Sequence, residues 1–144
     1  MPTRTARTAW NGTLQEGSGQ VELSSSKAGT FEVSFPKRAA DEAGGTTSPE
    51  ELIAAAHSSC YAMALSNEIG KAGGTPQALD ITAEVTLGQK DGASAITGIA
   101  LTVRGEVEGL DADGFQQAAQ AAKVGCPVSK ALAAVDIPQD AALE

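Results

Sequence analysis

The chain has 144 residues, of which 42% are hydrophobic, 19% are charged and only 3% are aromatic, and its formal net charge is −8. This length and composition predict a single globular domain over residues 1–144, with a core built from aliphatic side chains. Its acidity, with only ten Lys and Arg residues scattered along the chain, argues against nucleic acid and against an anionic membrane surface as partners.

The N-terminal part of the chain carries signals for short strands. Asn11-Gly12 is a hairpin turn signal between two short extended segments. From Thr30 to Pro36, apolar and polar residues alternate, which predicts a half-buried strand ended by the proline. A polar loop containing Arg38 follows. The N-terminus lacks the apolar run of a secretory signal, so we expect a soluble cytoplasmic protein whose two cysteines are thiols or a working redox pair.

A central helix is predicted from Pro49 to about Gly70. Ser48 can cap its first turn, Pro49 suits the first helical position, and Glu51 completes a capping box. Between Leu52 and Leu65 the helix is apolar almost all round, which is typical of a helix covered on every side. One small sheet and two short helices could hardly cover it, so we expect a homodimer in which two such helices pack together.

The C-terminal half predicts a long hairpin followed by helices. Two alternating segments, 79–90 and 95–109, flank the turn signal Asp91-Gly92. An amphipathic helix is expected from Asp111 to Gly125, a further helix from Cys126, and a last short strand at 136–138. Because strands and helices form separate runs and do not alternate, the fold class is α+β.

Two residues of the central helix could carry chemistry. Cys60 is either a small core residue, since free cysteines are commonly buried, or a reactive thiol. His57 lies three residues earlier on the same helix surface, so the two could form a nucleophile–base dyad for acyl transfer. Alternatively, His57 only makes a hydrogen bond within the packed structure, and a lone histidine is weak evidence for a metal.

Three further residues could belong to a site or could have a purely local role. Cys126 precedes Pro127 at a helix start, where free N–H groups favour a thiolate, so we expect an accessible, activated thiol or else a plain N-cap. Arg38 is either a solvated loop charge or a group that stabilises a thiolate. Glu50 suits the first turn of a helix on local grounds alone.

Two sequence motifs resemble the OsmC/Ohr family, and its OsmC (osmotically inducible protein C) branch more closely than its organic-hydroperoxide-resistance branch. They are "SPEELIAAAHSSCYAMALS" (48–66) and "AKVGCPVSKAL" (122–132). The resemblance covers essentially the whole chain. It implies an intertwined homodimer with antiparallel sheets packed around a central helix from each subunit. It also implies a thiol-dependent peroxidase of the oxidative and osmotic stress response, with sites at the subunit interface, that prefers organic hydroperoxides to hydrogen peroxide.

The resemblance also implies the residue roles. Cys60 takes the peroxidatic position, Cys126 the resolving one, and Glu50 the glutamate that holds the catalytic arginine by a bidentate pair. Arg38 takes the arginine's place and would lower the pKa of Cys60. The fallback candidates for that place are Lys37, Arg4 and Arg7.

The implied reaction forms a Cys60 sulfenic acid and then a Cys60–Cys126 disulfide, which an external dithiol, possibly on a lipoyl protein, reduces again. It needs no metal or organic cofactor. Glu50 and Cys60 are ten residues apart, about 15 Å along a straight helix, so we expect a composite site at the dimer interface. Two alternatives stay open: a Cys–His hydrolase or acyltransferase, and a non-enzymatic, stress-related ligand-binding dimer.

Overall fold

The computed structural model describes residues 1–144 and contains two three-stranded sheets and four helices. This arrangement confirms the α+β class. The chain divides into two compact units, residues 1–52 and residues 53–144, which are described separately. Whether the whole chain behaves as a single domain stays a prediction.

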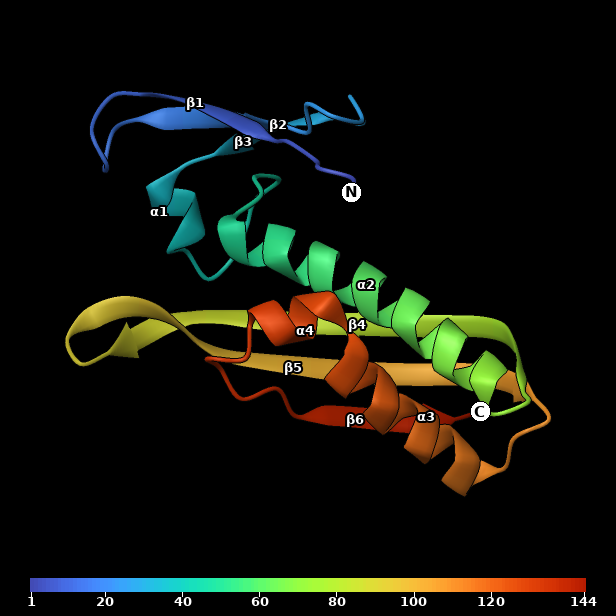
Figure 1. The fold of residues 1–144 in the computed structure, drawn as a ribbon. Helices are drawn as coiled ribbons and strands as arrows, with labels where there is room; N and C mark the ends of the chain where they lie inside the picture. The colour runs from blue at the N-terminus through green and yellow to red at the C-terminus, as the bar shows by residue number, and fades with distance from the viewer. The chain divides into compact units, whose positions relative to one another are not determined.

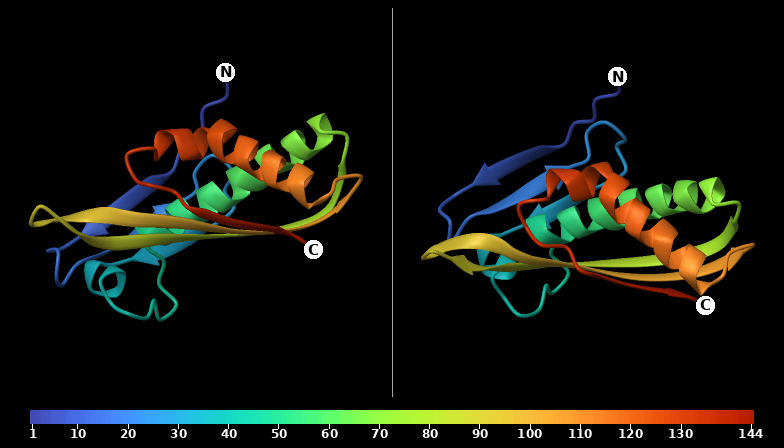
Figure 2. Two further views of the ribbon diagram at one scale, coloured as in Figure 1. Left: turned by 90° about the horizontal axis from the view of Figure 1, so that it is seen from below. Right: turned by 60° about the horizontal axis from the view of Figure 1, so that its bottom comes forward.

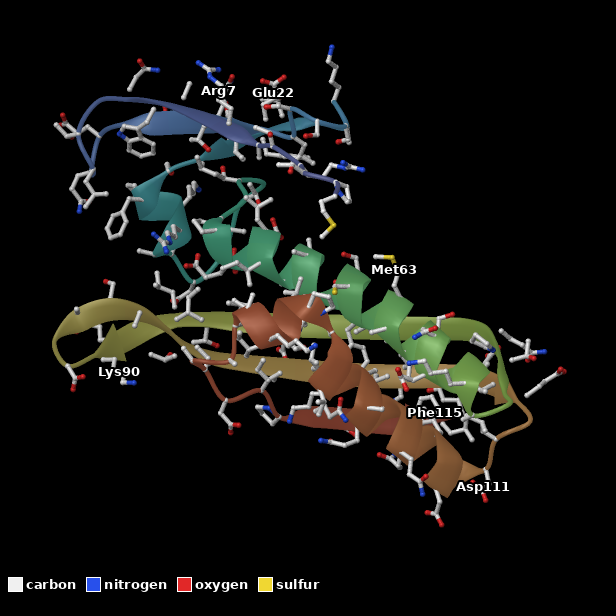
Figure 3. The ribbon with its side chains drawn as sticks, viewed as in Figure 1. Arg7, Glu22, Met63, Lys90, Asp111 and Phe115 are labelled. Carbon is white, nitrogen blue, oxygen red and sulfur yellow. The ribbon has the colours of Figure 1, made fainter.

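The first unit is built on an antiparallel sheet in the order β1-β2-β3. Its strands are β1 (Arg7–Asn11), β2 (Ser18–Glu22) and β3 (Thr30–Val33). Arg7 and Glu22, labelled in Figure 3, are register partners across β1 and β2. The Asn11-Gly12 turn signal does end β1, and Gly12 has a φ of 96°, which glycine adopts without strain.

The segment after β3 differs from the sequence expectation. The strand ends at Val33, and a short helix, α1 (Phe35–Arg38), replaces its predicted end and the start of the loop. Ser34 causes the change, because its hydroxyl accepts a hydrogen bond from the Lys37 N–H and caps the helix, while Pro36 suits the first helical turn. Phe31 is 42% exposed, whereas Val33 and Phe35 are half-buried, so the half-buried face expected here forms only in part.

The central helix α2 (Pro49–Lys71) has nearly the predicted bounds. Ser48 Oγ accepts a hydrogen bond from the Glu51 N–H at 3.1 Å, as the capping-box prediction required. The reciprocal half of the box is absent, because the Glu51 carboxylate instead accepts a hydrogen bond from the Thr47 hydroxyl at 2.6 Å. The helix begins in the first unit and continues through the second.

Within the second unit, α2 buries one stripe of residues spaced four apart, all fully buried: His57, Tyr61, Leu65 and Ile69. Met63 lies off this stripe, is 68% exposed and points away from the sheet (Figure 3). A single chain therefore covers only one side of the uncharged stretch of this helix, Leu52 to Leu65.

The second sheet has the order β4-β5-β6. The strands β4 (Thr75–Lys90) and β5 (Ala93–Glu108) form the predicted antiparallel hairpin. Asp91 and Gly92 both have positive φ, 53° and 79°, which matches the twist of a two-residue hairpin turn. The last strand, β6 (Gln139–Leu143), begins just after the predicted segment and runs parallel to β5, so the sheet is mixed and not purely antiparallel.

The helices of the second unit lie on one face of this sheet (Figures 1 and 2). After β5 the chain forms α3 (Ala112–Gly125), capped by the Asp111 side chain, and α4 (Pro127–Ala131), before it returns to the sheet edge as β6. The core between sheet and helices combines residues that alternate along β5 with a stripe on α3. These residues are Ile99, Leu101 and Val103, and Phe115, Ala118, Ala119 and Ala122.

Candidate active site

The two cysteines lie side by side in the second unit. Cys60 is on α2, and Cys126 is the single residue between α3 and α4; their sulfur atoms are 3.1 Å apart. The Cys126 N–H donates to the Ala122 carbonyl at the end of α3, and its own carbonyl accepts from the Lys130 N–H at the start of α4. Backbone hydrogen bonds to both helices thus fix the position of Cys126 opposite α2.

The two thiols differ in exposure. Cys60 is half-buried, whereas Cys126 is fully buried and belongs to the hydrophobic core. The expectation that Cys126 is accessible is therefore wrong. Its backbone ties to α3 and α4 bring the side chain inward among the residues that pack between helices and sheet.

An open groove adjoins Cys60 but not Cys126. Its volume is about 500 Å³, and it runs between α2 and the last turns of α3. Small and apolar side chains make up most of its wall near Cys60, and polar groups of α2 lie along the rest. The lining residues are Cys60, Met63, Ala64, Asn67, Glu68, Lys71, Ala121, Ala122, Gly125 and Pro127. A small molecule in this groove would lie against Cys60.

The surroundings of the two thiols favour a thiolate at Cys126. Burial raises the pKa of Cys60, and the hydrogen bond with Cys126 raises it further. Burial also acts to raise the pKa of Cys126, but hydrogen bonds from Cys60 and Ser129 outweigh it and leave this pKa below its ordinary value. The Cys126 side chain makes no regular capping bond, so the N–H groups of Ser129 and Val128 act on its sulfur as nearby partial charges.

His57 makes its hydrogen bond away from Cys60. Its Nε2 is 2.7 Å from the Ser129 hydroxyl, and both side chains are buried. Burial lowers the pKa of His57, so its ring is neutral near pH 7. The histidine is therefore placed as a packed, hydrogen-bonded residue, and it forms no hydrogen bond with Cys60 that would support the Cys–His hydrolase reading.

In the first unit, Arg38 and Glu50 form a bidentate ion pair. Arg38 Nη2 lies 2.7 Å from Glu50 Oε1, and Arg38 Nε lies 3.0 Å and 3.2 Å from the two carboxylate oxygens. Burial acts to raise the pKa of Glu50, but the hydrogen bonds and the charge of Arg38 outweigh it and hold this pKa below its ordinary value. Arg38 sits at the end of α1 and Glu50 in the first turn of α2.

The structure thus brings the four residues singled out in the sequence into two pairs, Cys60 with Cys126 and Arg38 with Glu50. Ser129 was missed, although it stands in the quoted motif Gly-Cys-Pro-Val-Ser. Its signal was its place three residues after Cys126, where a side chain can reach back to the residue that begins the helix.

Two other kinds of feature are absent from the structure. No group of three or more His, Cys, Asp or Glu side chains is arranged to hold a metal ion. None of the helices combines the length and apolar character needed to span a membrane.

Comparison with known proteins places these motifs in a family. Residues 41–138 match the family model described as OsmC-like protein. Peroxiredoxin OsmC of Escherichia coli (strain K12) is 45% identical over 125 residues, which is 87% of this chain and 86% of that protein, and Peroxiredoxin OsmC of Shigella flexneri matches equally.

Solved structures show the same fold. The organic hydroperoxide resistance protein OhrB of Bacillus subtilis superposes with a TM-score of 0.72 at 26% identity, over 97% of this chain and 98% of the other. An organic hydroperoxide resistance protein from Elizabethkingia anophelis gives a TM-score of 0.76 at 24% identity, over 100% and 98% of the two chains. From the matched residues and the identity to its curated relatives, we conclude that this chain belongs to the OsmC family.

Proposed function

We propose that the protein is a thiol-dependent peroxidase that reduces organic hydroperoxides, and hydrogen peroxide more weakly, to alcohols or water. Kinship with Peroxiredoxin OsmC at 45% identity over most of the chain makes it a peroxidase. The observation that carries the proposal is the pair of sulfur atoms 3.1 Å apart, one of them beside an open groove. A sulfenic acid formed on Cys60 would have its resolving partner already in place.

The difference in exposure supports Cys60 as the residue that takes the first step. A peroxide in the groove meets Cys60, whereas Cys126 is fully buried and does not line the groove. When the Cys60–Cys126 pair has lost one proton, its two sulfur atoms share the remaining one. Attack on the peroxide requires that this proton be on Cys126 and the negative charge on Cys60. The Cys60 thiolate attacks the distal peroxide oxygen, which carries the hydrogen, the O–O bond breaks, and Cys60 becomes a sulfenic acid. The departing alkoxide takes a proton from solvent and leaves as alcohol.

The second step joins the two sulfurs. The sulfur of Cys126 attacks that of the Cys60 sulfenic acid, the S–O bond breaks, and hydroxide leaves with the Cys126 proton as water. Because a disulfide bond is about 2.05 Å long, the two sulfur atoms must approach by only roughly 1 Å. An external dithiol, for which a lipoyl protein is our candidate, then reduces the disulfide. We propose no metal or organic cofactor.

The groove favours a substrate with an apolar body. A volume of about 500 Å³ with Met63, Ala64 and Pro127 among its walls suits an alkyl chain better than the small polar molecule hydrogen peroxide. We therefore place organic hydroperoxides above hydrogen peroxide as substrates, with the hydroperoxide group held at Cys60.

For the ion pair of the first unit, we propose that Arg38, held by Glu50, stabilises the Cys60 thiolate in a composite site of a homodimer. The proposal rests on the family resemblance and on the exposed side of α2, which one chain leaves uncovered. Chains with Arg38→Ala should be mixed with chains with Cys60→Ala and their peroxide turnover measured. A shared site predicts partial recovery, and no recovery would refute it.

Stopped-flow measurement of thiol loss tests the peroxidase reaction. Wild type, Cys60→Ser and Cys126→Ser would be mixed with tert-butyl, fatty-acid and hydrogen peroxides. Cys60→Ser should abolish thiol oxidation, and Cys126→Ser should leave a sulfenic acid that a dimedone probe traps. If Cys126→Ser alone abolishes the first oxidation, the two roles are reversed. If hydroperoxide oxidises neither thiol, the protein is not a peroxidase and the ligand-binding alternative stands.

A further inference from the structure

Two contacts of similar length join α2 to the chain around the start of α4. One is the sulfur pair of Cys60 and Cys126 at 3.1 Å, and the other joins His57 Nε2 to Ser129 Oγ at 2.7 Å. In both segments the two members are three residues apart, so the contacts lie about one helical turn from each other. The His57–Ser129 bond therefore fixes the register in which Cys126 faces Cys60.

The buried ring of His57 has one nitrogen that nothing satisfies. His57 is fully buried, and its Nδ1 has no hydrogen-bond partner. A neutral ring carries one proton, and we assign it to Nε2, because the other tautomer would bury an unpaired N–H group. Nε2–H then donates to the Ser129 oxygen.

This tautomer leaves the Ser129 hydroxyl proton free to donate elsewhere. Ser129 is 6% exposed, so water hardly competes for that proton. Ser129 follows Cys126, the residue that begins α4, by three residues, a spacing at which a side chain can reach back to the helix start. A hydrogen bond from the Ser129 side chain is also among the influences that lower the pKa of Cys126. The other titratable groups facing this sulfur are Cys60 and Tyr61, both on α2.

We propose that His57 and Ser129 form a hydrogen-bond relay, His57 Nε2–H to Ser129 Oγ and Ser129 O–H to Cys126 Sγ, that positions Cys126 for the disulfide step. Both are positioning residues, since they act on the reacting atoms through Cys126. This proposal deepens the proposed function and rests on it. It also gives a role to the only histidine of the chain, which the peroxidase steps otherwise leave unused.

The relay acts where negative charge resides on Cys126. In disulfide formation the proton of Cys126 moves to the departing hydroxide, so negative charge develops on the Cys126 sulfur, which the Ser129 hydroxyl stabilises. This sulfur gives an electron pair to the Cys60 sulfur, the S–O bond breaks, and water leaves. In reduction, the external dithiol attacks the disulfide at Cys60, and Cys126 leaves as a thiolate that the Ser129 hydroxyl stabilises. The relay does not accelerate the attack on the hydroperoxide, because that step needs the negative charge on Cys60 and not on Cys126.

The first measurement is the pKa of Cys126 in a Cys60→Ala background, from the ultraviolet absorbance of the thiolate against pH. Ser129→Ala should raise this pKa by about one unit, because the thiolate loses a hydrogen-bond donor that the neutral thiol needs less. His57→Ala should raise it too. His57→Gln should largely restore the wild-type value, because the glutamine amide can place an N–H near the position of Nε2.

The second measurement follows the two oxidation phases in chains that keep both cysteines. Ser129→Ala should slow the change from sulfenic acid to disulfide by about tenfold, the rate equivalent of one pKa unit. It should leave the first phase unchanged or slightly faster. Ser59→Ala is the matched control, because this serine is next to Cys60 but exposed and donates only to the Ala56 carbonyl.

The outcomes separate this proposal from the peroxidase reaction. An unchanged Cys126 pKa in folded Ser129→Ala, or no restoration by His57→Gln, would overturn the relay even if peroxide is consumed normally. The pKa measurement uses no peroxide, so it can support or overturn the relay in a protein that fails the peroxidase test. If His57→Ala fails to fold, Ser129→Ala decides alone, since it removes one oxygen and retains most of the side-chain volume.

Discussion

At the scale of single residues, Glu50 holds the guanidinium of Arg38 in a defined orientation. It is 7% exposed and accepts three hydrogen bonds from Arg38. A bidentate pair fixes the plane of the guanidinium as well as its position. The remaining N–H groups of Arg38 are then directed away from Glu50 and stay available to another anion.

Replacement of Glu50 by Gln tests this orienting role. The amide retains the shape of the side chain but loses the charge and one acceptor oxygen, so Arg38 should be held less firmly. We expect the kcat/KM for tert-butyl hydroperoxide to fall by about 10–100-fold, as for other supporting residues that orient a catalytic group.

The matched control is Glu51→Gln. This neighbour lies in the same first turn and is exposed, and its carboxylate accepts a hydrogen bond only from the Thr47 hydroxyl. Its replacement should leave kcat/KM within about twofold, as expected for an exposed side chain outside the site. Equal losses in both variants would mean that the helix start, and not the Arg38 pair, carries the effect.

Residue by residue, the sequence singled out candidate site residues where its motifs are local, and their catalytic roles stay predictions. Cys60, Cys126 and Glu50 stand in recognisable motifs, and the family pattern paired Glu50 with Arg38, which the structure bears out as a hydrogen-bonded contact. Ser129 could not be found in this way, because its partner His57 is 72 residues distant in sequence. The lowered pKa of Cys126 agrees with the sequence expectation for a thiol at a helix start, because the local N–H groups of Ser129 and Val128 contribute to it. The contribution of Cys60 to that pKa depends on a contact that only the fold brings together.

At the scale of elements, the packing of α3 on β5 depends on a glycine. A Cβ at Gly105 would lie 2.8 Å from Phe115 Cε2 and 3.1 Å from Leu79 Cδ2. Phe115 is fully buried and cannot swing into solvent (Figure 3). Gly105 is therefore where the aromatic ring of α3 rests directly on the strand backbone.

Gly105→Ala should lower the free energy of unfolding by about 1–3 kcal/mol, the usual cost of an added methyl group in a packed core. Urea unfolding followed by circular dichroism measures it. Gly98→Ala is the matched control on the same strand, since the nearest atom to its new Cβ would be 3.9 Å away. It should be neutral or slightly stabilising. A neutral Gly105→Ala would mean that Phe115 can shift without loss.

Elements whose signals are local were predicted well. The Asp91-Gly92 hairpin, the Ser48 cap and the Asp111 start of α3 depend on residues within a few positions of each other. Two elements were not predicted in their observed form. The helix α1 follows from the Ser34 cap, which competed with a strand-like alternation of residues, and β6 pairs parallel to β5 through contacts almost 40 residues apart in sequence.

At the scale of the whole molecule, the uncharged stretch of the central helix, Leu52 to Leu65, is only partly covered by its own chain. The residues off its buried stripe include Ala55, Ala56 and Met63, all exposed. Apolar surface of this kind on a central helix is typical of a face that another chain covers. The sequence argument for a homodimer used the same surface, and a dimer stays a prediction.

The stability of the protein should fall when the pH drops below about 6.5. His57 is the only histidine, and burial holds its folded pKa below the ordinary value of 6.5. Between these two pKa values the unfolded chain binds a proton that the folded chain does not. The free energy of unfolding therefore decreases as the pH falls through this window. Glu50, whose folded pKa is also lowered, adds its own loss only below about 4.5. Because few other side chains titrate between these two pH values, His57 should dominate the upper window.

Urea midpoints between pH 7.5 and 5 measure this dependence at constant ionic strength. Wild type should lose stability progressively below about pH 6.5, whereas His57→Gln, which retains a buried hydrogen-bonding side chain but cannot titrate, should have a nearly flat profile until carboxylates begin to protonate. A parallel decline in both proteins would contradict a buried neutral His57. It would also remove the basis for assigning the ring proton to Nε2, because a solvated ring would have no unpaired nitrogen.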